Sequence, residues 1–109
     1  MTIYNEGIEE HAIAAKLVDL LLARGEPVAV WDSEEETVTD SVDREEILQA
    51  LATTDEDTIC SGGFCYLLAW GNSGEELISD YSYPRDMREE ADRIFNQSNA
   101  AVEELRAKI

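Results

Sequence analysis

The sequence predicts an α+β fold, in which a small antiparallel β-sheet is flanked by helices. Residues 6–24 and 84–109 repeat apolar side chains at helical spacing, and the chain between them consists of short β-type runs separated by turn residues. The predicted order is α-β-β-α-β-β-β-α. Because 109 residues are enough for one hydrophobic core, we expect a single domain over residues 1–109.

The first helix is predicted over residues 6–24. Gly25 follows at the position of a helix C-cap, and Pro27 prevents the helix from continuing. Residues 28–32 and 37–39 are then expected as two strands joined by a turn. The apolar face of the helix comprises Ile13, Ala14, Leu17, Val18, Leu20, Leu21 and Leu22.

Two further helices are predicted. A short one over residues 44–52 has Asp43 at its N-cap and Glu46 at capping-box spacing. A long one begins near Pro84, which suits the first position of a helix. Residues 96–99 weaken its middle and are candidates for a kink or break. Its apolar positions are Met87, Ala91, Ile94, Phe95, Ser98, Val102, Leu105 and Ile109.

Three strands are predicted between these helices. Residues 58–60 and 64–70 form two of them around the turn at 61–63. The run 64–70 is apolar on both faces, which indicates a central strand covered on both sides, or one face lined by small groups. Residues 75–82 are the next antiparallel strand. Alternation places Leu77, Ser79 and Tyr81 on one face and Glu76, Ile78 and Asp80 on the other.

The chain is strongly and unevenly acidic. It has 25 acidic and 8 basic residues, for a net charge of −17. Residues 26–83 hold fifteen acids and one base, Arg44, and so carry −14 of this charge. Such a chain repels nucleic acid and anionic membranes, which leaves a basic protein surface or metal cations as partners. Solubility bias or adaptation to high salt remain alternatives, although the nearly neutral segment 84–109 argues mildly against both.

Catalysis and cofactor binding have little support in the sequence. The single histidine, His11, lies on the first helix, where a solvated or packed imidazole is far more common than a general base. The glycine-rich stretches 61–63 and 71–74 match neither a phosphate loop nor a dinucleotide fingerprint. A structural zinc site needs about four N or S ligands, and this chain has three at most, Cys60, Cys65 and His11. The acidic runs 32–36 and 55–57 lack the spacing of a calcium loop. We therefore expect no enzyme activity, no cofactor and no specific metal site.

A cytoplasmic location is expected. No apolar run reaches the length of a membrane span, and the N-terminus lacks the pattern of a secretory signal. A hairpin turn at 61–64 could bring Cys60 and Cys65 to a distance that a disulfide bridges. The reduced pair is nevertheless the favoured interpretation, because cytoplasmic thiols are kept reduced.

Acidic side chains at two places in the chain are predicted to bind the partner. Each DNA strand carries a phosphate about every 3.4 Å along its axis, and alternate residues of an extended chain are about 6.6 Å apart, close to two such steps. Glu34 with Glu36, and Asp55 with Asp57, have this relation. The candidate contacts are Asp32, Glu34, Glu35, Glu36, Asp40, Asp55, Glu56 and Asp57, with Glu75, Glu76 and Asp80 as secondary contacts.

The short length, the acidic clusters at 32–40 and 55–57 and the lack of a catalytic signature resemble small acidic phage-encoded inhibitors of host defence. These include DNA-mimic anti-restriction and anti-CRISPR proteins. The stretch 66–82 also looks like phage and prophage proteins of unassigned function. The resemblance implies a phage protein that acts as an inhibitor in the host cytosol, and it assigns no residue a role.

Two functions from different classes follow. The first is a stoichiometric inhibitor that occupies the basic nucleic-acid channel of a defence complex or nuclease. The second is an immunity or antitoxin-like protein that neutralises one basic partner through contacts centred on aromatic residues. Tyr66 is expected in the core, whereas Trp31 and Tyr83 stay open between core and interface. A housekeeping protein from a high-salt organism is a third possibility, and the oligomeric state is undetermined.

Overall fold

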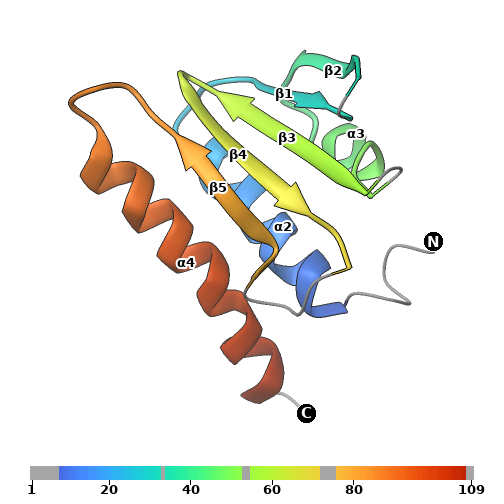
Figure 1. Ribbon diagram of the computed structural model, residues 1–109, viewed down its shortest axis with the longest axis vertical. Coiled ribbons are helices and arrows are strands. Elements are labelled where there is room, and N and C mark those ends of the chain that lie inside the picture. Colours follow the sequence, from blue (N-terminus) through green and yellow to red (C-terminus); the bar gives the residue numbers. More distant parts are fainter. Residues whose placement is uncertain (1–7, 33, 53–54, 72–75, 108–109) are drawn as a thin grey trace.

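The computed structural model describes residues 8–32, 34–52, 55–71 and 76–107. The predicted α+β class and element order are confirmed. Within these ranges the chain forms helices α2 (Ile8–Ala23), α3 (Arg44–Gln49) and α4 (Arg88–Ala107), and strands β1 (Val28–Trp31), β2 (Glu36–Ser41), β3 (Glu56–Ser61), β4 (Phe64–Ala69) and β5 (Ile78–Ser82), labelled as in Figure 1.

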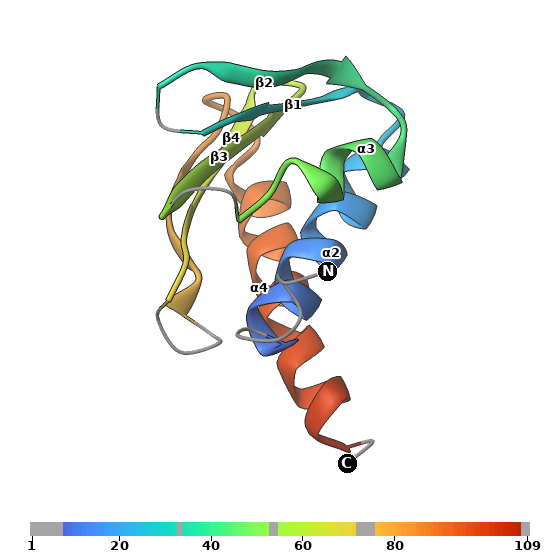
Figure 2. The ribbon, with the colours of Figure 1, turned by 90° about the vertical axis from the view of Figure 1, so that its right-hand side faces the viewer.

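The five strands form one antiparallel sheet in the order β2-β1-β3-β4-β5. The three helices lie on the same side of this sheet (Figure 2). Side chains alternate along β3 and β4, so that every second residue is buried against the helices. The other face of the sheet, called the open face below, has no helix over it among the described residues.

The core lies between the sheet and the helices. Tyr66, Phe64, Ile59 and Leu68 from the central strands are fully buried with Ile13, Leu17 and Leu21 of α2 and Ile94 of α4. The hydroxyl of Tyr66 donates a hydrogen bond of 3.0 Å to the carbonyl of Ala91, which connects the centre of the sheet to α4. Its burial raises the pKa of the phenol well above the ordinary value, so this hydroxyl stays protonated.

The predicted helix caps are largely confirmed. Gly25 has a φ of +84° and its N–H bonds to the carbonyl of Leu22, as a glycine at a helix end requires. The Asp43 side chain accepts from the backbone N–H groups of Glu45 and Glu46. In a full capping box the Glu46 side chain would also accept from the Asp43 backbone N–H. Here the Glu46 carboxylate accepts from the Ser41 hydroxyl. This helix ends at Gln49, earlier than predicted.

A β-bulge in β5 corrects the predicted face of that strand. Leu67 pairs with Asp80 and Leu68 pairs with Ile78, so Ser79 is an extra residue on β5. Ile78 and Tyr81 therefore both face the helices, and Asp80 faces the open side. Leu77, just before the strand, is also buried. The prediction of strict alternation from 76 to 82 is wrong at this point.

Two expectations about the last helix are also corrected. The helix begins at Arg88 rather than near Pro84, and the intervening residues make a turn in which the Met87 N–H bonds to the Pro84 carbonyl. It then runs without interruption through residues 96–99. Ser98 and Ala101 are buried where α4 packs on α2, so small side chains serve close packing here.

Cys60 and Cys65 form a disulfide, contrary to the favoured reduced interpretation. The turn between β3 and β4 has two glycines with positive φ, +55° at Gly62 and +89° at Gly63, which is the pattern of a type I′ hairpin. This turn pairs Ser61 with Phe64 and places the two cysteines directly opposite each other, with their Cα atoms 4.1 Å apart. The location of the turn thus brings the sulfurs together.

The disulfide predicts a measurable contribution to stability. It closes a short loop, with a sequence separation of 5. Replacing both Cys60 and Cys65 by Ser should therefore lower the free energy of unfolding, measured by urea denaturation, by about 2 kcal/mol. A thiol titration of the unreduced protein should find no reactive thiol. Two equivalents of free thiol before any reductant is added would contradict the pairing.

Candidate partner-binding surface

The topology brings one end of every strand together. At one end of the sheet, the last residues of β1 and β4 lie beside the first residues of β2, β3 and β5 (Figure 1). Register confirms the placement, because Trp31 pairs with both Glu36 and Thr58, and Glu56 pairs with Ala69. We call this region the acidic end and define it by seven described carboxylates, those of Asp32, Glu34, Glu35, Glu36, Asp55, Glu56 and Glu76.

The turn from β1 to β2 is organised by Asp32. Its Oδ1 accepts from the backbone N–H groups of Glu34 at 3.1 Å and Glu35 at 3.0 Å. These hydrogen bonds favour the ionised carboxylate and lower the pKa of Asp32 below its ordinary value. The Asp32 N–H also donates to the carbonyl of Glu35, at 3.0 Å. The turn is therefore closed by its own groups, and the side chains of Glu34 and Glu35 are exposed.

Asp57 is not a surface contact, and its prediction as one is corrected. The residue is 0% exposed. Its Oδ2 accepts from the backbone N–H of Ala52 at 2.8 Å and from the indole Nε1–H of Trp70 at 2.6 Å. Asp57 thus holds the loop after α3 and the end of β4 to the start of β3. Burial, together with the nearby negative charge of Asp32, raises the pKa of the carboxyl in spite of the two hydrogen bonds.

The alternation of β3 could have revealed this role. Asp57, Ile59 and Ser61 share the inward face, whereas Glu56 and Thr58 point to the open side. The predicted spacing of Asp55 with Asp57 therefore does not exist as a surface pair. No comparable pattern in the sequence indicates Trp70 as the partner of Asp57, because that contact depends on the pairing of β3 with β4.

The remaining predicted contacts lie apart from the acidic end. Asp40 is exposed on β2 near its far end, with a φ of +46°, which Asp tolerates better than most residues. Asp80 is exposed in the middle of β5, on the open face. Glu75 lies outside the described residues. The structure thus brings seven of the predicted acids to one end and leaves Asp40 and Asp80 at the sides of the sheet.

The cations of the described chain lie mostly in the helical layer. Arg24 bonds to Glu90 at 3.0 Å and Arg44 bonds to Asp19 at 2.6 Å. Arg88 and Arg93 lie 3.6 Å from Asp92 and Glu90 on their own helix. The five strands contain no Lys or Arg. Each of these four ion pairs therefore joins residues of the helices and their ends, and none of them includes a carboxylate of the acidic end.

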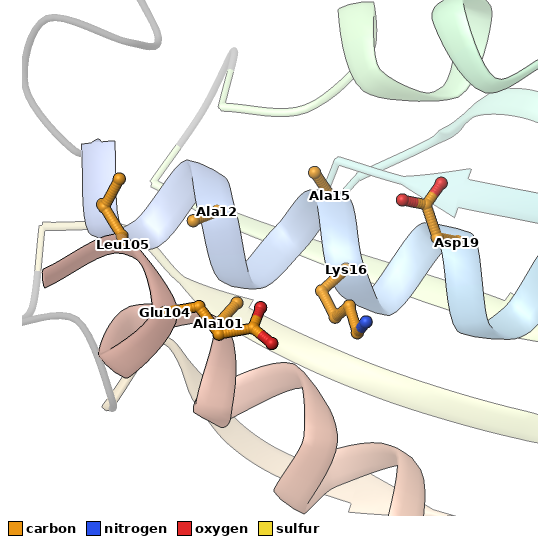
Figure 3. Close-up of a pocket in the computed structure, with 7 residues that line it drawn as sticks. All are labelled: Ala12, Ala15, Lys16, Asp19, Ala101, Glu104 and Leu105. Carbon is orange, nitrogen blue, oxygen red and sulfur yellow. The ribbon is translucent and has the colours of Figure 1, made fainter. Parts of the chain in front are cut away.

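A groove between α2 and α4 offers no chemistry of its own. It has a volume of about 220 Å³ and is lined by the small side chains of Ala12, Ala15 and Ala101, with Lys16 and Glu104 at its rim (Figure 3). The alanines allow the two helices to approach closely. Among the described residues no group of His, Cys, Asp or Glu has the arrangement of a metal site. Within the same ranges, no helix has the length and hydropathy of a membrane span.

Removing the Asp57 carboxylate should destabilise the fold. Asp57→Ala leaves the part-buried N–H groups of Ala52 and Trp70 without this acceptor, at a cost of roughly 2–4 kcal/mol in the free energy of unfolding. Asp57→Asn retains one acceptor oxygen and should cost less. The exposed neighbour Asp55→Ala is the control and should change stability by no more than about 0.5 kcal/mol. Equal losses for Asp55→Ala and Asp57→Ala would refute the internal role.

The raised pKa of Asp57 predicts a pH effect. The folded state keeps this proton to higher pH than the unfolded state, so the stability contributed at low pH is lost as pH rises through the folded pKa. Asn does not titrate and removes this loss. The free energy of unfolding of Asp57→Asn, relative to the wild type, should therefore increase between about pH 4 and pH 7. A relative stability that is flat or falling over this interval would contradict the assignment.

Comparisons with known proteins supply no relative. No protein-family model matches the chain, and neither the curated proteins nor the solved structures give a match. No residue role is therefore transferred from another protein. Charge, exposure and strand register are the observations on which a function can be based.

Proposed function

We propose that the protein is a stoichiometric inhibitor that binds the basic nucleic-acid-binding surface of a defence complex or nuclease. The observation that carries the proposal is the acidic end, where the ends of five strands gather seven carboxylates while the strands themselves contain no Lys or Arg. Such a surface attracts a cluster of Lys and Arg and steers its association. The carboxylates take the place of phosphates, and no catalytic step is involved.

The spacing of the acidic end supports phosphate imitation in a revised form. Neighbouring strands lie about 4.8 Å apart, and alternate residues of one strand about 6.6 Å apart. Carboxylates contributed by several strands and one turn therefore form a two-dimensional set, in place of the two separate pairs expected at 34/36 and 55/57. Glu36 on β2 and Glu56 on β3 are members of this set, with β1 between their strands. A groove lined by Lys and Arg on two walls is the complement of such a set.

The proposal includes a phage origin and a cytoplasmic site of action, where defence complexes and nucleases meet their substrates. A reducing cytoplasm opens disulfides, so the Cys60–Cys65 pair would be thiols there. The hairpin would then depend on its backbone ladder and on the two glycines of its turn. The acidic end lies at the opposite end of β3 and β4 from this turn, so opening the disulfide acts at a distance from its carboxylates.

One observation favours the alternative of an immunity or antitoxin-like protein. The side chain of Trp31 is 43% exposed on the open face. Exposed tryptophans are frequent anchors of specific protein interfaces. In this alternative a single basic protein is neutralised, and its nucleic acid does not compete for the same surface.

Neutralising the acidic end should abolish binding to the target. In the test variant Glu34, Glu35, Glu36 and Glu56 are all changed to Gln. The matched control changes four exposed acids of the helical layer to Gln: Glu45, Glu89, Glu103 and Glu104. Both variants lose the same charge, but only the first should weaken the complex, by about two orders of magnitude in Kd, because several charge contacts are lost together.

The target for this measurement is obtained by affinity capture from a host lysate, and its Kd is then measured with purified protein. Affinity should fall steeply between about 50 and 200 mM salt, and excess duplex DNA should displace the inhibitor. A complex that DNA does not displace supports the immunity alternative. Equal binding by the two glutamine variants would eliminate the acidic end as the binding site.

A further inference from the structure

The open face carries one continuous row of side chains across all five strands. Pairing gives the row directly, because Trp31 lies opposite Glu36 on one side and Thr58 on the other, Thr58 lies opposite Leu67, and Leu67 lies opposite Asp80. Residues paired across a sheet share a face, and Trp31, Thr58 and Leu67 alternate with residues buried against the helices, so the row lies on the open face. The row is therefore acidic at both ends and uncharged along its middle.

The middle of the row exposes apolar surface. Trp31 is one of two large hydrophobic side chains exposed within the described ranges, and Leu67 is half-buried. The adjoining row holds Ala29 and the Cys60–Cys65 disulfide. An aromatic side chain beside other apolar groups, with carboxylates around them, has the organisation of an interface centre with its polar rim.

Two shallow hollows lie in this face, and Cys65 of the disulfide lines both of them. The first, of about 190 Å³, is formed by Thr58, Leu67 and Cys65 with Asp80 among its lining residues. The second, of about 360 Å³, is formed by Ala29 and Cys60 with Asp40 and Glu26. Each combines apolar groups with a carboxylate. Lys and Arg side chains have the complementary form, an apolar stem with a cationic head.

We propose that the open face is the docking surface for an amphipathic α-helix of the partner, whose apolar stripe is flanked on both sides by Arg or Lys. The inference rests on the proposed function and adds a second contact with the same basic partner, on the open face next to the acidic end. The apolar stripe packs along β3, over Trp31 and Leu67. The flanking cations reach Glu36 on one side and Asp80 on the other.

The dimensions of the sheet fit this occupant. β3 is the middle strand, and β2 and β5 each lie two strand spacings from it, about 9.5 Å. A helix is about 10–12 Å wide with its side chains, so a helix aligned with β3 leaves both acidic margins within the reach of extended Arg side chains. A second copy of this chain does not fit, because two acidic rims would repel each other.

Two synthetic peptides of about 18 residues, made from Leu, Ala and Arg in equal amounts, test the proposal. One places Leu on a single helical stripe with Arg along both edges, and the other scrambles the same residues. The wild type should bind the amphipathic peptide at least about tenfold more tightly than the scrambled peptide in calorimetric titration. Binding of both peptides should weaken with added salt, because both are cationic.

Substitutions in the row should remove this preference. Trp31→Ala deletes the apolar centre, and Thr58→Lys places a cation in the middle of the row, so each variant should bind the two peptides equally. Val42→Ala removes the other exposed hydrophobic side chain, which is 72% exposed outside the row, and should keep the preference. Circular dichroism verifies that each variant is folded.

The outcomes separate this inference from the proposed function. Equal binding of the two peptides by the wild type, or an undiminished preference in both Trp31→Ala and Thr58→Lys, overturns the docking face. The proposed function fails separately, if neutralising the acidic end leaves the affinity for the captured target unchanged. If the wild type still prefers the amphipathic peptide in that case, the open face binds an amphipathic helix although the acidic end does not imitate phosphates.

Discussion

Helices α2, α3 and α4 all lie on the same face of the sheet, and the rest of the described structure depends on this constraint. Alternation along β3 and β4 turns Ile59, Phe64, Tyr66 and Leu68 toward the helices, where they are buried. Each inward residue makes its neighbour point outward, so the open face is determined by the same alternation that builds the core. A surface that holds Trp31 and half-buried Leu67 is thus a direct product of how the core is made.

Charged side chains on the helix side of the sheet join the helices to the strands. Arg24 stacks its guanidinium over the ring of Phe64, 4.3 Å from the centroid, and bonds to Glu90 of α4. The hydroxyl of Tyr81 donates to Asp92 at 2.6 Å, and the Tyr81 ring stacks on Phe95. Burial and this hydrogen bond raise the pKa of Tyr81 to about 12. These contacts of Glu90, Asp92 and Arg24 fasten the helical layer to the sheet, and Arg24 pairs with Glu90 rather than with a carboxylate of the acidic end.

Local signals in the sequence predicted the elements, and tertiary contacts decided what those signals could not. Gly25, Pro27 and Asp43 mark helix ends through interactions with near neighbours, so their effect is visible in the chain. The bulge at Ser79 depends on pairing with β4, and the uninterrupted helix through Ser98 depends on packing against α2. For the candidate site, composition identified the acidic segments. The inward direction of Asp57 and the row through Trp31 required strand register.

The outermost strands β2 and β5 expose unpaired backbone groups, which in other proteins invite a foreign strand to add to the sheet. Here each carries an irregular register and an outward carboxylate, Asp40 or Asp80, and β2 also has Glu36. These features obstruct lateral growth of the sheet into larger assemblies. The negative charge that suits a cationic partner therefore also keeps copies of the molecule apart.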